Sequence, residues 1–156
     1  MLVLGVGNPM RGDDGVGPEV ASRVARLGLP NLEVAYETEP LALLDHLGQK
    51  PGHDVVVVVD ATAPGPHPGR VIVLQVAAQP LVRPGRPLGS HGLSVVDAVE
   101  LARSMGLLPP RLTVIGIEAL SDQLGAGLSD PVSERVDDAV RLVLQALTAS
   151  ATAPGG

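Results

Sequence analysis

Five consecutive valines at residues 55–59 are the feature of this 156-residue chain that most restricts its fold. Valine is β-branched and favours extended backbone. A strand with one face in water would alternate apolar and polar residues, so a run that is apolar at every position indicates burial on both faces. Asp60 follows the run directly. The sequence therefore predicts a central, fully buried strand with a carboxylate at its end.

The rest of the chain is predicted to alternate between strands and helices. Strand patterns occur at residues 2–6, 32–36, 70–76 and 112–117. Helical patterns occur at residues 18–27, 41–47, 94–105 and 132–147. This order predicts an α/β fold in three layers, with a mostly parallel, twisted sheet of about five strands flanked by helices on both faces. We expect a single domain over residues 1–147 and a disordered tail at 148–156.

Composition and charge exclude several classes of protein. With 11 basic and 17 acidic residues the net charge is −6, which opposes binding to nucleic acid or to an anionic membrane. Tyr36 is the single aromatic residue, so there is no stacking surface for single-stranded nucleic acid. The chain has no cysteine, and any metal ion would be bound by carboxylate, imidazole or backbone oxygen. We expect a cytoplasmic protein with neither a nucleic-acid nor a membrane partner.

Three predicted loops could carry chemistry, because ligands in open α/β sheets bind beyond the carboxyl ends of the strands. In the first loop, helix capping explains one of the adjacent residues Asp13 and Asp14 but not both, so we interpret Asp14, nearer the helix, as functional. Asp60 is either a turn residue or a carboxylate that needs a partner. His91 is the one histidine of four at a junction between predicted elements. Two carboxylates and an imidazole could bind a metal ion.

Two other readings of the first loop are less favourable. The loop begins like a dinucleotide-binding fingerprint, but Met10 stands where the third glycine belongs and Pro9 removes a backbone N–H. A cation suits the loop better than a phosphate. The Gly-Asn-Pro turn would also suit a peptidyl-tRNA hydrolase-like enzyme, but the acidic net charge opposes that function.

Five motifs along the chain together resemble a known family. They are Gly5-Val6-Gly7-Asn8, Gly12-Asp13-Asp14-Gly15-Val16-Gly17, Val59-Asp60-Ala61, Ser90-His91-Gly92-Leu93-Ser94 and Ile115-Gly116-Ile117-Glu118. In this order they resemble the nickel-iron hydrogenase maturation endopeptidases, over roughly residues 1–147. Many members of that family have glutamate at the position of Asp14 and proline at the position of Ala119.

The resemblance implies a reaction and a site. These enzymes remove the C-terminal extension of a hydrogenase large-subunit precursor after nickel insertion, and nickel in the substrate serves as the recognition element. Asp14, Asp60 and His91 would be the catalytic residues and the ligands of nickel, for which zinc or cadmium could substitute. Cleavage could use a metal-activated water, or Asp14 or Asp60 could act as a general base. The alternative is a metal-dependent recognition or nickel-delivery module that does not cut.

Overall fold

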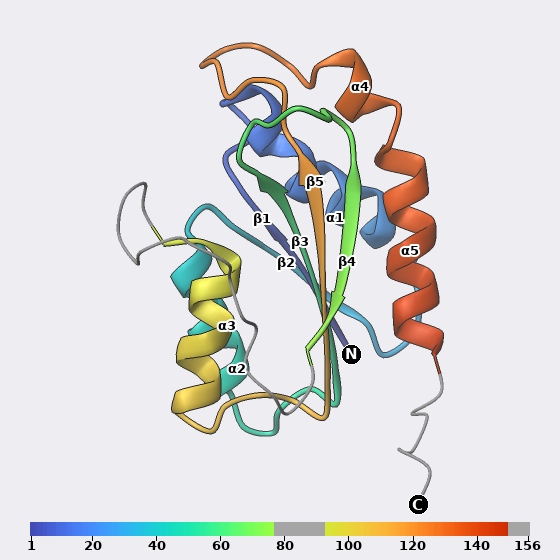
Figure 1. The fold of residues 1–156 in the computed structure, drawn as a ribbon. Coiled ribbons are helices and arrows are strands. Elements are labelled where there is room, and N and C mark those ends of the chain that lie inside the picture. Colours follow the sequence, from blue (N-terminus) through green and yellow to red (C-terminus); the bar gives the residue numbers. More distant parts are fainter. Residues whose placement is uncertain (77–92, 150–156) are drawn as a thin grey trace, which may run out of the picture.

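The computed structural model describes residues 1–76 and 93–149 and contains one five-stranded sheet with the strand order β2-β1-β3-β5-β4. The strands are β1 (Leu2–Val6), β2 (Glu33–Glu37), β3 (Val55–Thr62), β4 (Val71–Gln75) and β5 (Arg111–Glu118). All neighbouring strands are parallel except β4, which runs antiparallel to β5 at one edge (Figure 1). The predicted mostly parallel sheet is confirmed.

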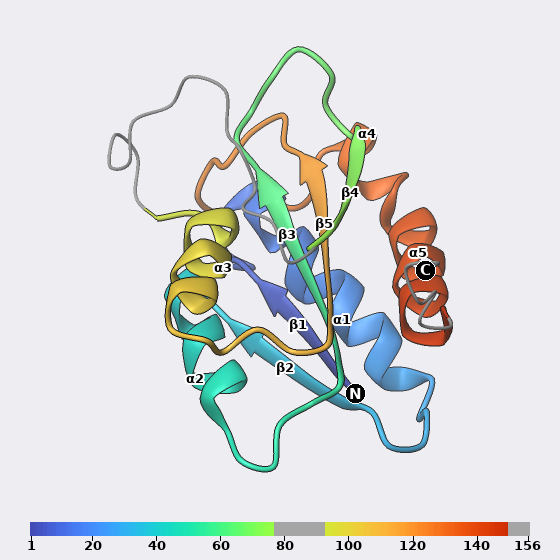
Figure 2. The ribbon, with the colours of Figure 1, turned by 60° about the horizontal axis from the view of Figure 1, so that its bottom comes forward.

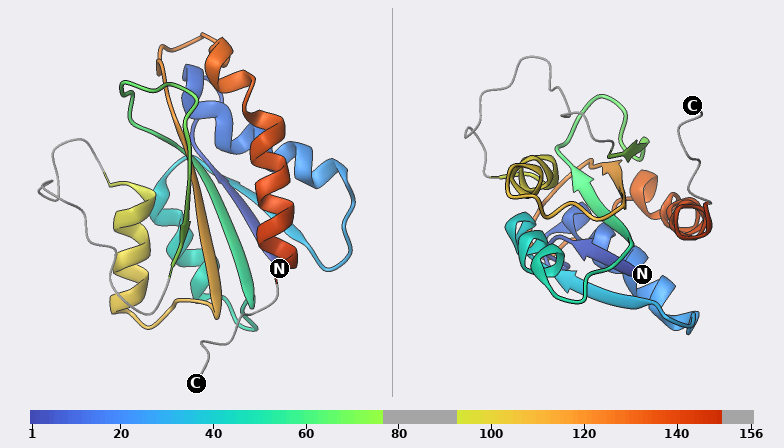
Figure 3. Two further views of the ribbon diagram at one scale, coloured as in Figure 1. Left: turned by 45° about the vertical axis from the view of Figure 1, so that its right-hand side comes forward. Right: turned by 90° about the horizontal axis from the view of Figure 1, so that it is seen from below.

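Helices cover both faces of this sheet, as Figures 1 and 2 show. One face packs against α1 (Val16–Arg26) and α5 (Val136–Thr148), and the other against α2 (Leu43–Gly48) and α3 (Val95–Ser104). Seen from below in Figure 3, the sheet lies between these two helical layers, which confirms the three-layer prediction. Short helices η1 (Gly12–Gly15), η2 (Pro40–Ala42) and α4 (Asp130–Ser133) lie in the connections. Across the described residues, every helix is too short or too polar to span a bilayer.

The valine run forms the buried centre of the sheet. Val57 and Val59 pack in the core under α1 and α5, while Val56 and Val58 pack in the core under α2 and α3. The strand continues beyond the valines to Thr62, so Asp60 lies inside β3 and pairs with Gly116 of β5 instead of following the strand. Since side chains alternate along a strand, Asp60 is on the face covered by α2 and α3.

The helix predicted for residues 132–147 is divided into α4 and α5. At the division the Arg135 N–H donates to the Val132 carbonyl, three residues back, which tightens the backbone into a turn. Val132 and Val136 are nevertheless both buried in the same core, so the apolar periodicity continues across the break. Thr148 is the last residue of α5, and residues 150–156 of the expected tail lie outside the described residues.

The helix predicted from Ser94 begins with the expected capping box. The Ser94 hydroxyl accepts the Asp97 N–H at 3.3 Å, and the Asp97 carboxylate accepts the Ser94 N–H at 2.8 Å. These two bonds satisfy amide groups that the first turn of α3 would otherwise leave unpaired. The sequence therefore located the start of α3 correctly.

Helix α1 lies unusually close to the sheet because glycines face each other across the contact. A Cβ atom added to Gly17 would overlap the carbonyl oxygens of Val6 and Val59, and one added to Gly5 would lie 2.5 Å from the carbonyl oxygen of Gly17. The first turn of α1 thus rests on the backbone of β1 and β3. The same contact fixes the short loop that joins β1 to α1.

We predict that Gly17→Ala lowers the free energy of unfolding by about 3 kcal/mol or more, because the added methyl group must push α1 away from two strands. Gly48→Ala is the matched control, since a Cβ at Gly48 meets nothing within 4 Å. Urea denaturation of both variants measures the difference. Equal midpoints for the two variants would show that α1 can move away from the sheet at little cost.

Candidate active site

Two of the predicted site residues, Asp14 and Asp60, come together at the carboxyl end of the sheet. Asp14 belongs to η1, in the loop between β1 and α1, and Asp60 belongs to β3, the strand next to β1. Their carboxylates are close enough for the negative charge of Asp14 to act on Asp60. Asp14 and Asp60, which the sequence predicts on two separate loops, thus form an acidic pair in the structure.

Burial, and then the charge of Asp14, raise the pKa of Asp60 to about 7, although a hydrogen bond from the Ala61 backbone opposes the rise. Near neutral pH the free protein is thus divided between the protonated and the ionised form of Asp60. A carboxyl group in this state can accept or release a proton, or can ionise fully when a cation arrives.

The position of Asp14 is set by its backbone neighbours. The Asn8 N–H donates to the Asp14 carboxylate at 2.7 Å. Gly7 lies against the backbone of Asp14 with a φ of 133°, and a Cβ at Gly7 would overlap the Asp14 carbonyl oxygen. Only glycine allows this approach. The Gly-Asn pair after β1 therefore holds Asp14 in place through both its backbone and its side chain.

Asp13, next to Asp14, has a structural role that the sequence left open. Its side chain is fully buried and accepts four hydrogen bonds: from the backbone N–H groups of Leu120, Ser121 and Ser129, and from the Ser129 hydroxyl, at 2.7–3.1 Å. Burial raises the pKa of Asp13, but these bonds outweigh burial and hold the pKa below its ordinary value. The ionised Asp13 thus fixes the loop between β5 and α4 to the loop that carries Asp14.

A second buried carboxylate, Glu118, holds the loop between β3 and β4. It accepts the His67 N–H at 2.6 Å and pairs with the Arg70 guanidinium at 2.9 Å. Gly65 lies close against it, since a Cβ there would be 2.5 Å from Glu118 Oε1. Glu118 is therefore an anchor of the loop that follows Asp60.

His91, the third predicted site residue, lies outside the described residues. Within residues 1–76 and 93–149, no group of three or more His, Asp or Glu side chains is arranged to hold a metal ion. Asp14 and Asp60 supply two oxygen donors, and the ionised form of Asp60 is disfavoured by burial and by a like charge. A divalent cation would relieve both effects, so the donor pair suits a cation whose remaining ligands come from elsewhere.

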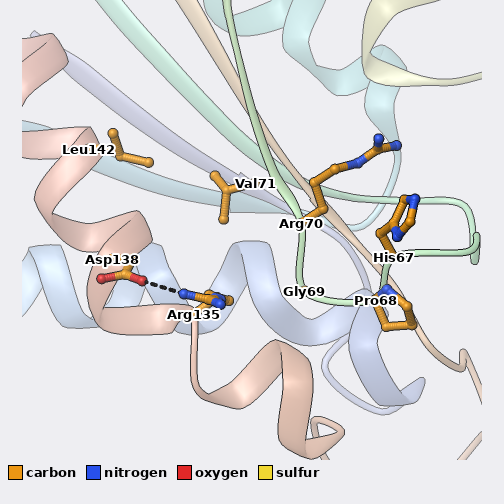
Figure 4. A pocket seen from close by; sticks show the side chains of 8 residues that line it. All are labelled: His67, Pro68, Gly69, Arg70, Val71, Arg135, Asp138 and Leu142. Atoms are coloured by element: carbon orange, nitrogen blue, oxygen red, sulfur yellow. Dashed lines mark hydrogen bonds and ion pairs between the residues drawn. The ribbon is translucent and has the colours of Figure 1, made fainter.

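A groove of about 490 Å³ lies apart from this acidic pair, between β4 and α5 (Figure 4). It is lined by His67, Pro68, Gly69, Arg70, Val71, Arg135, Asp138 and Leu142. Arg135 pairs with Asp138 at 3.1 Å, and Arg70 pairs with Glu118. Neither Asp14 nor Asp60 lines the groove, so it is distinct from the candidate active site.

The sequence contains both Asp13 and Glu118 in its motifs but does not predict what they anchor, because their partners are distant in the chain or are backbone groups. Asp13 and Ser129 are 116 positions apart, and most of the donors to Asp13 are amides that any residue would supply. The pair of adjacent aspartates was the available signal. The pair indicated that one of the two aspartates is structural, but it did not indicate which groups bond to that aspartate.

We predict that Asp13→Asn lowers the free energy of unfolding by about 2–3 kcal/mol, because the amide nitrogen would face a buried N–H donor. Asp122→Asn is the control: Asp122 is exposed and its ion pair with Arg11 is long, at 3.9 Å. Chemical denaturation of the two variants tests this role. An Asp13→Asn protein as stable as Asp122→Asn would contradict the assignment of Asp13 as the anchor.

A family model and individual relatives both compare this chain with proteins of hydrogenase maturation. The family model described as hydrogenase maturation protease matches residues 37–146, more than half of the chain. The hydrogenase 2 maturation protease of Escherichia coli strain K12 is 28% identical over 152 residues, covering 96% of this chain and 92% of the relative. The hydrogenase expression/formation protein HupD of Rhodobacter capsulatus is 28% identical over 153 residues, covering 96% and 71%.

Solved structures show the same fold. The hydrogenase maturating endopeptidase HybD from Escherichia coli superposes with a TM-score of 0.74 at 25% identity, covering 94% of this chain and 90% of that one. The maturation protease HycI from Thermococcus kodakarensis gives a TM-score of 0.70 at 26% identity, covering 95% and 92%. The match of the family model over most of the chain, with these relatives, shows that the chain belongs to the hydrogenase maturation protease family and is a peptidase.

Proposed function

We propose that this peptidase removes the C-terminal extension of a nickel-iron hydrogenase large-subunit precursor after nickel has been inserted. The observation that carries the proposal is the acidic pair, Asp14 and Asp60, at the carboxyl end of the sheet in a chain of the maturation protease family. The names of relatives as hydrogenase maturation proteases support a hydrogenase precursor as the substrate. Membership of a peptidase family favours cleavage over the alternative of a recognition module that does not cut.

Nickel would be recognised as part of the substrate. We propose that Asp14 and Asp60, with His91 as a third ligand, bind the nickel carried by the precursor, and that zinc or cadmium could take its place at these oxygen and nitrogen donors. When bound, the ion would supply Lewis-acid chemistry next to the scissile peptide bond. The Asn8 N–H holds Asp14 in place for this contact.

The carboxylates could also act on water directly. With a pKa of about 7, Asp60 could take a proton from the water that attacks the scissile carbonyl and then deliver a proton to the departing amine. Asp14 would keep Asp60 basic through its negative charge. In either route the negative charge of Asp60 is required.

We predict that Asp60→Asn lowers the rate of precursor processing by at least about 10², because asparagine keeps the shape of the side chain but removes the charge and the base. The thermal midpoint should stay unchanged or rise, since a buried carboxylate beside a like charge is relieved. The measurement is the mass of the precursor C-terminus over time.

The matched control is Asp54→Asn, the same change on an exposed aspartate just before β3 begins. It should process the precursor at the wild-type rate. A folded Asp60→Asn protein that matches Asp54→Asn in rate would show that Asp60 is structural.

Nickel recognition makes a separate prediction. Precursor prepared without nickel should stay full length under conditions in which nickel-loaded precursor is trimmed, because the ion would supply a binding contact to the acidic pair. Trypsin digestion of both precursors controls for the accessibility of the extension. Equal trimming of the two precursors would contradict the role of nickel as a recognition element.

A further inference from the structure

Two loops beside the acidic pair expose apolar side chains to solvent. Among the described residues, Leu124 and Met10 are the two most exposed large hydrophobic side chains, at 72% and 64% of their full accessible surface. Leu120, on the same loop as Leu124, is half exposed. Together we call these three residues the apolar rim. Large side chains of this kind cluster on a surface mainly where another molecule covers them.

The loops of the apolar rim are held together by backbone contacts. The Gly125 N–H donates to the Met10 carbonyl at 2.8 Å, and Arg11 forms an isolated antiparallel bridge with Leu124. Figures 1 and 3 both show the segment between β5 and α4 beside the segment between β1 and α1. The rim is therefore a built surface made of two loops.

Hydrogen bonds of Asn8 and Leu120 connect the apolar rim to the loop that carries Asp14. Asn8 donates its N–H to the Asp14 carboxylate at 2.7 Å, and its own side-chain oxygen accepts the Met10 N–H at 2.9 Å. On the other loop, the Leu120 N–H binds the buried carboxylate of Asp13, the neighbour of Asp14. Both loops of the rim are thus fixed relative to Asp14.

We infer that the apolar rim docks an apolar stretch of the precursor polypeptide next to its scissile bond. The inference rests on the proposed function. The occupant follows from continuity: whatever chain is cut at Asp14 and Asp60 must pass over the loops that hold them. A polypeptide covering Met10 and Leu124 would remove from water the most exposed apolar surface of the described residues.

The test is the double variant Met10→Ser/Leu124→Ser in steady-state cleavage of nickel-loaded precursor. Docking contributes equally to the bound substrate and to the transition state, so KM should rise about 10-fold or more while kcat stays within about two-fold. Because both side chains are exposed, the thermal midpoint should not change.

The matched control is Leu27→Ser/Met105→Ser. Leu27 and Met105 are also exposed, at 51% and 56%, but they lie at the C-terminal ends of α1 and α3, away from the carboxyl end of the sheet. The control should keep the wild-type KM. A rim variant with the same KM as this control overturns the inference, and so does a loss confined to kcat.

Two further measurements separate this inference from the proposed function. If the wild-type protein does not trim the precursor, the proposed function fails, but calorimetric binding of the precursor to wild type and weaker binding to the rim variant would still support docking. A wild-type protein that neither cuts nor binds the precursor overturns both. A wild-type dimer in sedimentation that the rim variant dissociates would assign the rim to a second copy of the chain and overturn docking of the precursor.

Discussion

The direct contact between the first turn of α1 and the backbone of β1 and β3 sets the geometry on which the rest of the site depends. Gly5 and Gly17 permit this contact because neither has a side chain to separate helix from sheet. The connection from β1 to α1 is therefore compressed against the end of the sheet, and Gly7 continues the contact onto the backbone of Asp14. A loop held on both sides in this way places a carboxylate with little freedom to move.

Two buried carboxylates, Asp13 and Glu118, hold the loops around the acidic pair. Asp13 organises the segment after β5, and Glu118 organises the segment after β3, each by accepting backbone N–H groups. Such bonds stabilise the ionised form in the interior, where an unpaired carboxylate would be unfavourable. Asp60, in contrast, accepts one backbone N–H and lies near the negative charge of Asp14, and burial with this charge raises its pKa to about 7. The larger number of donors around Asp13 thus accounts for the opposite directions in which the pKa values of Asp13 and Asp60 are shifted.

Much of the fold could be predicted from local sequence patterns, but only part of the candidate active site could be predicted in this way. The valine run, the capping box at Ser94 and the periodicity of the helices are encoded by neighbouring residues, and the three-layer sheet follows from them. The run did not show that β3 extends to Thr62, because that length is set by pairing with β5. Asp14 and Asp60 were predicted from their places after the first strand and directly after the valine run. The role of Asp13 could not be, since it depends on amides more than 100 positions away.

The bond between Asp13 and Ser129 also bears on the order of events during synthesis. The ribosome releases the loop with Asp13 and Asp14 early, but the residues that anchor this loop follow more than 100 positions later. Until Leu120 and Ser121 have emerged, the Asp13 carboxylate has no partner from the segment that follows β5, and its two bonds to Ser129 form last. Chains that have not yet extended to Ser129 therefore lack part of the set of donors that anchors the loop with Asp14.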